Sequence, residues 1–363
     1  MAIRPLLKNN GGRLRKVDEE LKEFLESKKS KIKVIGCGGA GNNTITRMNY
    51  EGIEGAETIA VNTDAQDLLY SQADKKVLIG RDLTKGLGAG GDPNIGMESA
   101  KETREELKTT IQNADMVFVT CGLGGGTGTG SAPVVAGIAK QLGILTVGVV
   151  TLPFSMEGKQ RMENALTGLA RMRQSVDTLL IIPNDKLLEV VPDISINTAF
   201  KMVDDILVNS VRGIVELITK AGLVNLDFAD VKAVMGNGGM AMIGVGESNV
   251  NGRALESVMK ALNDPFLAVD IEGARGALIN VSGGADMSLN EAKEIVEVVS
   301  SKLSDNAQII WGARVEENLK DTIKTMVVVT GVKEKEFYKG VFTNGTTDKK
   351  TLEKVLGIDF IKN

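Results

Sequence analysis

A glycine-dense segment at residues 121–132, with the sequence CGLGGGTGTGSA, constrains this chain more than any other feature. The apolar, β-branched run 115–120 before it predicts a buried strand. The stretch 133–142 after it predicts a helix with Pro133 near its first turn. Glycine allows a backbone to turn tightly and approach a ligand closely, and the free amides at a helix start favour negative charge. The segment therefore predicts an anion site, most simply one for phosphate.

Two further glycine-rich loops accompany it, at residues 36–43 (GCGGAGNN) and 86–93 (GLGAGGDP). Three such loops suit a chain of three phosphates. The first loop also satisfies the G-x-G-x-x-G fingerprint, so a dinucleotide-binding oxidoreductase with Asp64 or Glu57 on the ribose stays open. No P-loop motif is present and no lysine lies inside the three loops, so amides and a metal ion would carry the phosphate charge. The candidate phosphate contacts are Gly38, Gly39, Ala40, Gly41 and Asn42 in the first loop, Ala89, Gly90 and Gly91 in the second, and Gly124, Gly125, Gly126, Thr127, Gly128, Thr129 and Gly130 in the third.

Composition removes several functional classes. The 363 residues include no histidine and only two cysteines, Cys37 and Cys121, which excludes a histidine-based triad and argues against a disulfide framework. A net charge of −4 argues against nucleic acid as the main partner. Neither a long apolar run nor a signal peptide is evident, so we expect a cytoplasmic protein without direct membrane insertion, and no dedicated metal site within the chain.

Strand-like runs alternate with helical stretches from residue 31 to about residue 183, which predicts an α/β fold with a doubly wound parallel sheet. Residues 97–112, 133–142 and 157–173 are among the expected helices. The longest helical pattern, 197–221, is apolar over a wide face and predicts a helix packed between two domains. The expected divisions are a charged N-terminal extension (1–30), a Rossmann-like nucleotide domain (31–196), a central helix (197–222), a smaller α+β domain (223–332) and a polar tail (333–363).

At this point the motifs resemble a known family. The segment Gly124–Gly130 looks like the signature of the tubulin superfamily. Four further motifs resemble the FtsZ family of cell-division GTPases, in order over residues 31–331. They are the turn at 38–42, the tripeptide Asn62-Thr63-Asp64, the segment 152–161 and the tripeptide 182–184. The resemblance is closer to archaeal FtsZ than to eukaryotic tubulin. It implies a tubulin/FtsZ-like fold, binding of GTP and GDP, and Mg²⁺ held through the phosphates and water.

The resemblance also assigns the rest of the nucleotide pocket. Glu157 and Arg161 would contact the ribose and phosphate side, and Asn184 the sugar and base. Phe200 would stack on guanine, and Asp204 would accept hydrogen bonds from guanine N1–H and the amino group, which adenine cannot match. The alternatives are core packing for Phe200, a solvated position for Asp204, and a surface ion pair for Glu157 and Arg161.

Candidate hydrolytic acids follow the long helix in the segment Asn225-Leu226-Asp227-Phe228-Ala229-Asp230. Asp227 and Asp230 also suit a capping box at the start of a helix. About 20 helical residues separate Asp204 from this segment, roughly 30 Å at 1.5 Å per residue. Acids that far away would have to act on the nucleotide of another subunit, and such a head-to-tail contact generates a filament. The resemblance implies the same arrangement, with Asn225, Asp227 and Asp230 completing the neighbour's site.

The resemblance implies further partners and a location. The chain would form a head-to-tail homopolymer in the division ring at mid-cell, on the inner face of the membrane. Residues 357–363 (GIDFIKN) would dock a membrane-tethering division protein, although an ordinary frayed terminus explains them almost as well. A tubulin-like cytoskeletal GTPase with a role in cell shape is the alternative within the same superfamily.

Overall fold

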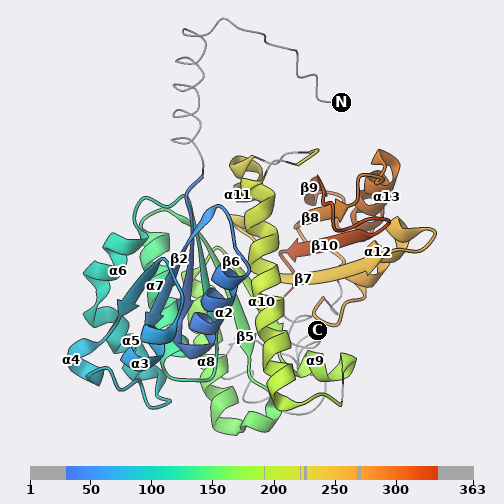
Figure 1. Cartoon of the computed structure of the whole chain (residues 1–363). Coiled ribbons are helices and arrows are strands. Elements are labelled where there is room, and N and C mark those ends of the chain that lie inside the picture. The colour runs from blue at the N-terminus through green and yellow to red at the C-terminus, as the bar shows by residue number, and fades with distance from the viewer. Residues whose placement is uncertain (1–29, 192, 221, 225–226, 268–270, 334–363) are drawn as a thin grey trace, which may run out of the picture. The chain divides into compact units, whose positions relative to one another are not determined.

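The computed structural model describes residues 30–333 except 192, 221, 225–226 and 268–270. Within this part of the chain one ten-stranded sheet runs in the order β3-β2-β1-β4-β5-β6-β7-β10-β8-β9. Figure 1 shows the long helix α10 (Ile196–Thr219) running alongside that sheet. Most of the predicted N-terminal extension (1–30) and most of the predicted polar tail (333–363) lie outside the described residues.

The first part of the sheet is parallel from β3 to β6, because each strand is followed by a helical connection back to its amino end. This confirms the expected doubly wound arrangement. Its strands are β1 (Ile32–Cys37), β2 (Ala56–Asn62), β3 (Lys75–Leu78), β4 (Met116–Gly122), β5 (Leu145–Leu152) and β6 (Thr178–Pro183). Its helices are α2 (Gly38–Tyr50), α3 (Ala65–Tyr70), α4 (Arg81–Thr84), α5 (Pro93–Glu102), α6 (Arg104–Ile111), α7 (Thr127–Gln141), the short 3₁₀ helix η1 (Ser155–Glu157), α8 (Lys159–Ser175) and α9 (Asp185–Val190).

The second part of the sheet continues directly from the first. Strand β7 (Gly239–Ser248) pairs in parallel with β6 over Thr178–Leu180 and antiparallel with β10 (Ile323–Thr330). Strands β8 (Gly276–Gly283) and β9 (Gln308–Val315) complete it, with helices α11 (Phe228–Met235), α12 (Arg253–Leu262) and α13 (Leu289–Ser300). The predicted smaller α+β unit is therefore present, but its strands and those of the nucleotide-binding part form a single sheet.

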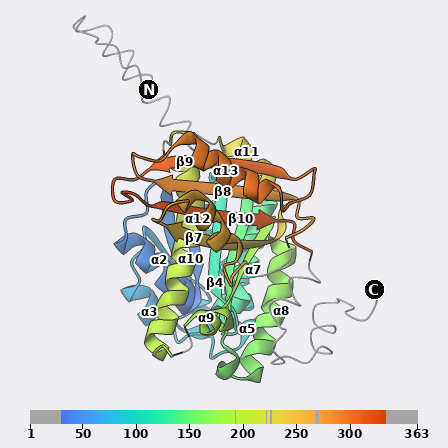
Figure 2. The same ribbon diagram turned by 90° about the vertical axis from the view of Figure 1, so that its right-hand side faces the viewer.

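Two separate cores cover the two faces of this sheet, as the side view in Figure 2 helps to follow. Neighbouring residues of β1 alternate between them: Val34 belongs to one core and Ile35 to the other. Helices α5–α8, α12 and α13 contribute to the core that contains Ile35, and α2, α10 and α11 to the core that contains Val34. Burial on both faces explains the continuous apolar runs of the central strands.

Helix α10 contacts both parts of the sheet, as its wide apolar face predicts. It contributes Val203, Leu207 and Val211 to a core shared with β4 and β5, and the same core contains Met326 of β10. Gly213 allows the close approach, because a Cβ there would lie 2.4 Å from the Met326 sulfur. The side chain of Ser195 caps the start of α10 by accepting from the Thr198 amide.

Helix boundaries differ from three expectations. Helix α7 begins at Thr127, six residues before Pro133, so the proline lies inside the helix and the glycine motif itself forms its first turn. The predicted helix 97–112 is two helices that meet at Thr103. The long helix ends at Thr219, before Gly222. In each case the start or end depends on local hydrogen bonds that apolar periodicity does not encode.

Candidate functional site

A cavity of about 270 Å³ opens at the carboxyl ends of β1, β4 and β5. This is the edge where ligands bind in open α/β sheets. The predicted residues that line it come from five separate stretches of the chain: Gly38, Gly39 and Ala40; Gly125, Gly126, Thr127 and Gly128; Glu157 and Arg161; Asn184; and Phe200 and Asp204. The fold thus brings together groups that lie up to 166 positions apart in the sequence.

Two helix starts face each other at one end of the cavity. Helix α2 begins at Gly38 and α7 at Thr127, and neither N-cap residue provides a side-chain cap, which leaves the first amides available to an anion. The loops are in contact, since a Cβ on Gly38 would lie 2.7 Å from the Gly128 nitrogen. Gly38 also has a φ of +71°, which favours glycine. Gly125 borders open space, with no atom within 4 Å of a Cβ placed there.

Several predicted phosphate contacts serve packing and do not line the cavity. A Cβ on Gly41 would lie 2.6 Å from the Thr120 carbonyl oxygen of β4, and one on Gly130 would overlap the Pro93 carbonyl of α5. The Thr129 hydroxyl accepts a hydrogen bond of 2.8 Å from the Gly124 amide and so fixes the glycine loop. Gly41, Gly124, Thr129 and Gly130 therefore shape the cradle from behind.

Two buried amide side chains in this region have unsatisfied polar atoms. Asn42, in the first turn of α2, is fully buried, and neither its oxygen nor its nitrogen makes a hydrogen bond of normal geometry, although its side chain lies near enough to Asp67 to lower the pKa of that carboxyl. Asn184, at the end of β6, has an unpaired side-chain oxygen and lines the cavity. Unsatisfied buried polar groups are rare in folded proteins, so both positions fit a site that is completed by a ligand or water.

The third glycine loop lies against the second. A Cβ on Gly126 would lie 2.9 Å from the Ala89 Cβ, and the Asn164 side-chain nitrogen donates to the carbonyl oxygens of Gly91 and Gly124 at 3.4 Å each. Ala89, Gly90 and Gly91 do not line the cavity itself. Asn164 instead links Gly91 of this loop to Gly124 of the third loop.

Phe200 and Asp204 line the cavity from α10, where they lie one turn apart. Phe200 is 43% exposed and meets Phe154 edge to face, with ring centroids 5.4 Å apart, so it is not an ordinary core residue. Burial raises the pKa of Asp204 to about 6, against the opposing influence of Arg47. An aromatic face beside an unpaired carboxylate is chemically suited to a planar base with adjacent N–H donors.

Glu157 and Arg161 line the same cavity and also pair with each other. The Arg161 Nε lies 3.1 Å from a Glu157 carboxylate oxygen, and the other Glu157 oxygen accepts from the Phe154 amide at 2.8 Å. The ion pair that was the simpler explanation is therefore present, at the cavity wall.

Sequence reasoning gave no site role to Thr63 or Asp67 in the polar cluster after β2, and it considered Asp64 only as a ribose contact in the dinucleotide-binding alternative. The Thr63 hydroxyl lies 2.6 Å from that of Thr127, and a Cβ on Gly39 would lie 3.8 Å from an Asp67 carboxylate oxygen. Burial, followed by the charge of Asp64, raises the pKa of Asp67. The available signal was the tripeptide Asn62-Thr63-Asp64, which was noted as part of the resemblance.

The candidate acids lie elsewhere. Asp227 caps α11 by accepting from the Asp230 amide at 2.9 Å, and the Asp230 carboxylate accepts from the Asp227 amide at 3.4 Å. This is the capping box that the spacing predicts, and both residues are exposed. Neither belongs to the nucleotide cavity, and Asn225 lies outside the described residues.

Comparisons with known proteins decide the family. Residues 31–192 match the GTPase domain of the Tubulin/FtsZ family, and residues 239–333 match the FtsZ family C-terminal domain. The chain is 63% identical over 315 residues to cell division protein FtsZ 1 of Methanocaldococcus jannaschii, covering 87% of this chain and 86% of the relative. The chain belongs to the FtsZ family. It is accordingly a tubulin-superfamily GTPase of cell division, and the resemblance to archaeal FtsZ is confirmed.

Other FtsZ relatives and solved structures agree. Cell division protein FtsZ of Methanothermobacter thermautotrophicus is 55% identical over 338 residues, 93% of this chain and 88% of the relative. The empty FtsZ dimer of M. jannaschii superposes with a TM-score of 0.84 at 62% identity, over 88% of this chain and 93% of that one. CetZ1 of Haloferax volcanii, a GDP-bound monomer, has a TM-score of 0.76 at 24% identity, over 90% and 98% of the chains, and shows the shared fold alone. Among the described helices, none has the length and apolar character needed to cross a membrane.

Proposed function

We propose that this FtsZ-family chain binds GTP in the 270 Å³ cavity and hydrolyses it at the junction between two subunits of a filament. One observation carries the proposal: the cavity is lined by the starts of α2 and α7 and by Phe200 and Asp204, while the described acids Asp227 and Asp230 lie exposed beyond the far end of α10. From Asp204 to Thr219, α10 alone spans about 22 Å at 1.5 Å per residue. A second subunit, stacked head to tail, is the simplest source of acids for the cavity.

Binding would use the two ends of the cavity differently. The phosphates would receive hydrogen bonds from the amides at the starts of α2 and α7, aided by both helix dipoles. The guanine would stack on Phe200 and donate from N1–H and its amino group to Asp204. Adenine lacks this pair of donors and would leave the carboxylate unpaired, which makes the cavity selective for guanine.

We further propose that Mg²⁺ accompanies the nucleotide and is held through phosphate oxygens and water. Among the described residues no cluster of three or more acids, histidines or cysteines could hold a metal ion by itself. One carboxylate beside the first glycine loop is Asp67, next to Gly39, whose raised pKa reflects burial and the charge of Asp64. A cation near the phosphates would offset that repulsion and neutralise charge on the transferred phosphoryl group.

Asp227 and Asp230 would orient the attacking water toward the γ-phosphate of the neighbouring subunit, with Asn225 as a third contact. Their capping box holds the two carboxylates on the first turn of α11 and fixes their spacing before the neighbour arrives. The isolated subunit therefore has a complete binding site and an incomplete hydrolytic one.

For partners and location, we propose head-to-tail protofilaments that form the division ring at mid-cell, at the inner face of the membrane. Residues 357–363, which lie outside the described residues, would dock a membrane-tethering division protein. Deletion of this segment should leave GTP hydrolysis and sedimentation unchanged while it abolishes retention of filaments by the tether in a pull-down. Undiminished retention would assign tethering to another part of the chain.

The proposed function is tested by phosphate release measured across a range of protein concentrations, alongside sedimentation with GTP or GDP. Activity per molecule should be near zero at low concentration and rise where GTP-dependent sedimentation begins. Activity per molecule that is constant below the onset of assembly would mean that one subunit hydrolyses GTP alone.

A further inference from the structure

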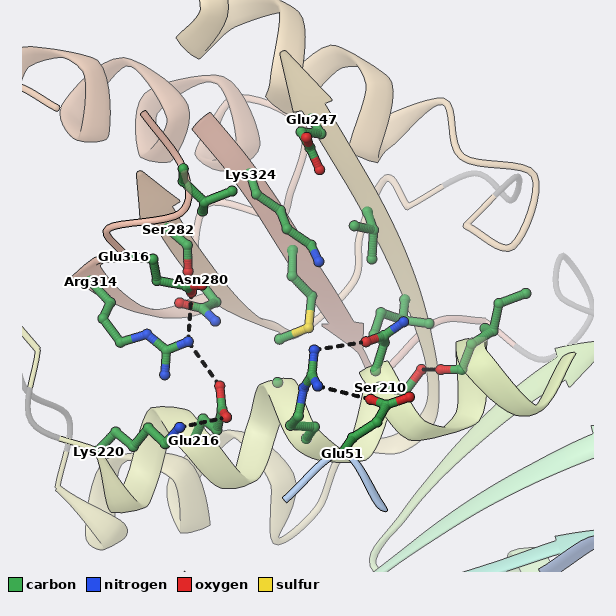
Figure 3. Close-up of a pocket in the computed structure, with 18 of the residues that line it drawn as sticks. Glu51, Ser210, Glu216, Lys220, Glu247, Asn280, Ser282, Arg314, Glu316 and Lys324 are labelled. Carbon is green, nitrogen blue, oxygen red and sulfur yellow. Dashed lines mark hydrogen bonds and ion pairs between the residues drawn. The ribbon is translucent and has the colours of Figure 1, made fainter. Parts of the chain in front are cut away.

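A second and larger cavity, of about 900 Å³, lies between α10 and the strands β7, β10, β8 and β9 (Figure 3). The two cavities share no lining residue, although α10 contributes residues to both. Its wall near the end of α10 is strongly charged. Glu216 and Lys220 come from the end of the helix, while Arg314 and Glu316 come from β9 and the residue just after it.

Arg314 is the centre of this charged cluster. One guanidinium nitrogen, Nη2, donates to Glu216 at 2.8 Å and to Glu316 at 2.6 Å, and Lys220 donates to the other Glu216 oxygen at 2.9 Å. The side chains of Arg314 and Glu216 are only 19% and 11% exposed. Burial alone would raise the pKa of Glu216, but the hydrogen bonds from Lys220 and Arg314 hold it below its ordinary value. Glu216 is therefore charged at neutral pH and fixed in place.

The same strand also holds the segment that follows α10. The Leu223 amide donates to the Ala313 carbonyl at 2.8 Å, and Val224 forms an isolated antiparallel bridge with Ala313. The fit is close, because a Cβ on Gly222 would lie 2.6 Å from that carbonyl oxygen. Ala313 and Arg314 are consecutive, so the end of α10 and the segment after it are anchored at neighbouring positions of β9.

Helix α11 rests on β9 as well. Val231 and Val234 of α11 belong to the same core as Ile310 of β9. Ile310 and Arg314 are four residues apart on one strand and so face the same side of the sheet. One strand thus supports the end of α10, residues 222–224 after it, and the helix that Asp227 caps.

We propose that Arg314 is a positioning residue for hydrolysis: by holding Glu216 against β9, it places Asp227 and Asp230 for the nucleotide of the neighbouring subunit. This inference rests on the proposed function, in which those acids act across the junction. Without the guanidinium, Glu216 is a largely buried carboxylate with Lys220 as its remaining ion-pair partner, and the end of α10 is free to shift from β9. Catalysis is sensitive to such shifts, since a displacement of about 1 Å can lower a rate by about a hundredfold.

The test variant is Arg314→Met, which keeps an unbranched apolar stem and removes the charged guanidinium. GTP affinity should be unchanged, because Arg314 is remote from the nucleotide cavity, while phosphate release per sedimented subunit should fall by about ten- to a hundredfold. Arg314→Lys should recover part of the rate, since one ammonium can still bond Glu216. Gly222→Ala should lower turnover in the same way by displacing the pairing at Ala313, without touching any charge.

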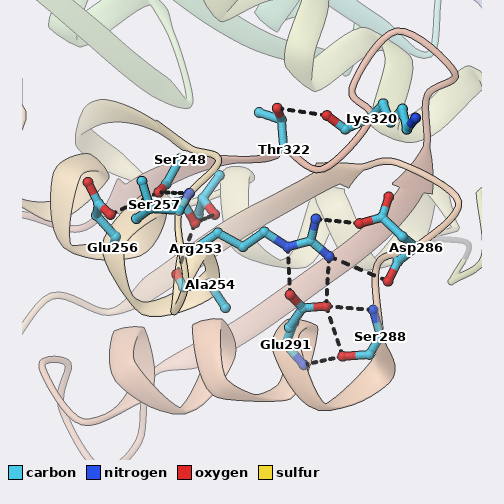
Figure 4. A network of polar contacts seen from close by, with 12 residues as sticks. Ser248, Arg253, Ala254, Glu256, Ser257, Asp286, Ser288, Glu291, Lys320 and Thr322 are labelled. Carbon is cyan, nitrogen blue, oxygen red and sulfur yellow. Dashed lines mark hydrogen bonds and ion pairs between the residues drawn. The ribbon is translucent and has the colours of Figure 1, made fainter.

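Arg253 provides a matched control on the opposite face of the sheet (Figure 4). Its side chain is 13% exposed and binds two carboxylates, Glu291 through Nε at 2.7 Å and Asp286 through Nη1. Arg253→Met removes a similarly buried arginine from the α12–α13 side of the sheet. It should lower thermal stability but not turnover per sedimented subunit. Equal loss of turnover in Arg253→Met and Arg314→Met, at matched loss of stability, would overturn the proposal in favour of general destabilisation.

A mixing experiment separates this inference from the proposed function. Gly125→Val should block the nucleotide cavity and leave the acids sound, so it should restore phosphate release when it is mixed with Asp230→Ala. If that reference mixture fails, the shared site is wrong. If it succeeds and Arg314→Met is restored in the same way, its defect lies on the acid side, as we propose. Suppose instead that the reference mixture succeeds. If Arg314→Met alone then releases phosphate at the normal rate, or if mixing with Gly125→Val does not restore its phosphate release, only the positioning role is rejected.

Discussion

At the scale of single residues, the glycines of the phosphate loops divide into two groups. Gly126 and Gly128 are packing positions, because a Cβ would lie 2.9 Å from Ala89 or Asp92 atoms at the first and 2.9 Å from the Cys37 carbonyl oxygen at the second. Gly125, Gly126 and Gly128 all line the cavity, but only Gly125 has open space where its side chain would be. The sequence motif alone does not show which glycine has space for a side chain, because each of the three is flanked by glycine or threonine.

This distinction predicts that Gly125→Val abolishes GTP binding and leaves the fold intact. A valine there would occupy the space that the phosphates need, while Gly128→Val would also lower stability. Titration calorimetry measures the affinity and thermal melting the stability. Gly137→Val, which also enters open space but away from the cavity, is the control and should bind GTP normally. Normal GTP affinity in Gly125→Val would remove the phosphates from this end of the cavity.

Asp204 gives a second prediction, for pH dependence. Its pKa in the empty protein is about 6, and N–H donors of a bound guanine favour the charged form, so binding lowers that pKa. GDP affinity should therefore decrease as pH falls through about 6, by up to about tenfold per pH unit from this group. Asp204→Asn should lose this component and retain only the titration of the phosphates, which both proteins share. Identical pH profiles for the two proteins, measured by calorimetry, would remove Asp204 from the base contact.

The same carboxyl affects the stability of the empty protein in the opposite direction to GDP affinity. The folded-state pKa of about 6 lies above the ordinary value of 3.8, so the folded protein binds more protons than the unfolded chain between these values. The empty protein should lose stability as pH rises from 4 to above 6, relative to Asp204→Asn. Melting temperatures of the two proteins across this range measure the difference directly.

At the scale of elements, the apolar pattern predicted most strands and the long helix but misplaced helix boundaries. Pro133 suggested a helix start, yet the helix begins six residues earlier, because the glycine motif adopts helical geometry while its first amides remain free for a ligand. The break at Thr103 carries no proline or glycine signal. By contrast, the Asp227–Asp230 spacing predicted a capping box that the structure contains.

That capping box allows stability to be separated from chemistry. Asparagine caps helices about as well as aspartate, so Asp227→Asn should change stability by less than about 0.5 kcal/mol. It carries no negative charge and should lower phosphate release per sedimented subunit by about a hundredfold or more. Ser288→Ala, which breaks the capping box of α13, should cost about 1 kcal/mol and leave turnover unchanged. If Asp227→Asn retains full turnover, Asp227 is a cap and nothing more.

At the scale of the whole molecule, the alternation of strands and helices predicted the doubly wound half and a smaller second unit. It did not predict that β6 and β7 join them, because this pairing covers only three register positions of strands separated by α10. The same limit applies to the acids. Their distance from the cavity follows from helix length, whereas their attachment to β9 through Ala313 and Arg314 depends on contacts between distant segments.

The central claim is that each hydrolytic site is shared by two subunits. The most direct measurement is phosphate release from a mixture of Asp230→Ala, which keeps a sound cavity, and Gly125→Val, which keeps sound acids. Each variant alone should be almost inactive, and co-sedimentation verifies that both enter the same filaments. The account predicts that mixing restores phosphate release, with a maximum near equal proportions, because that ratio gives the most junctions with a sound cavity facing sound acids. Co-assembled filaments that remain as inactive as the separate variants would contradict it.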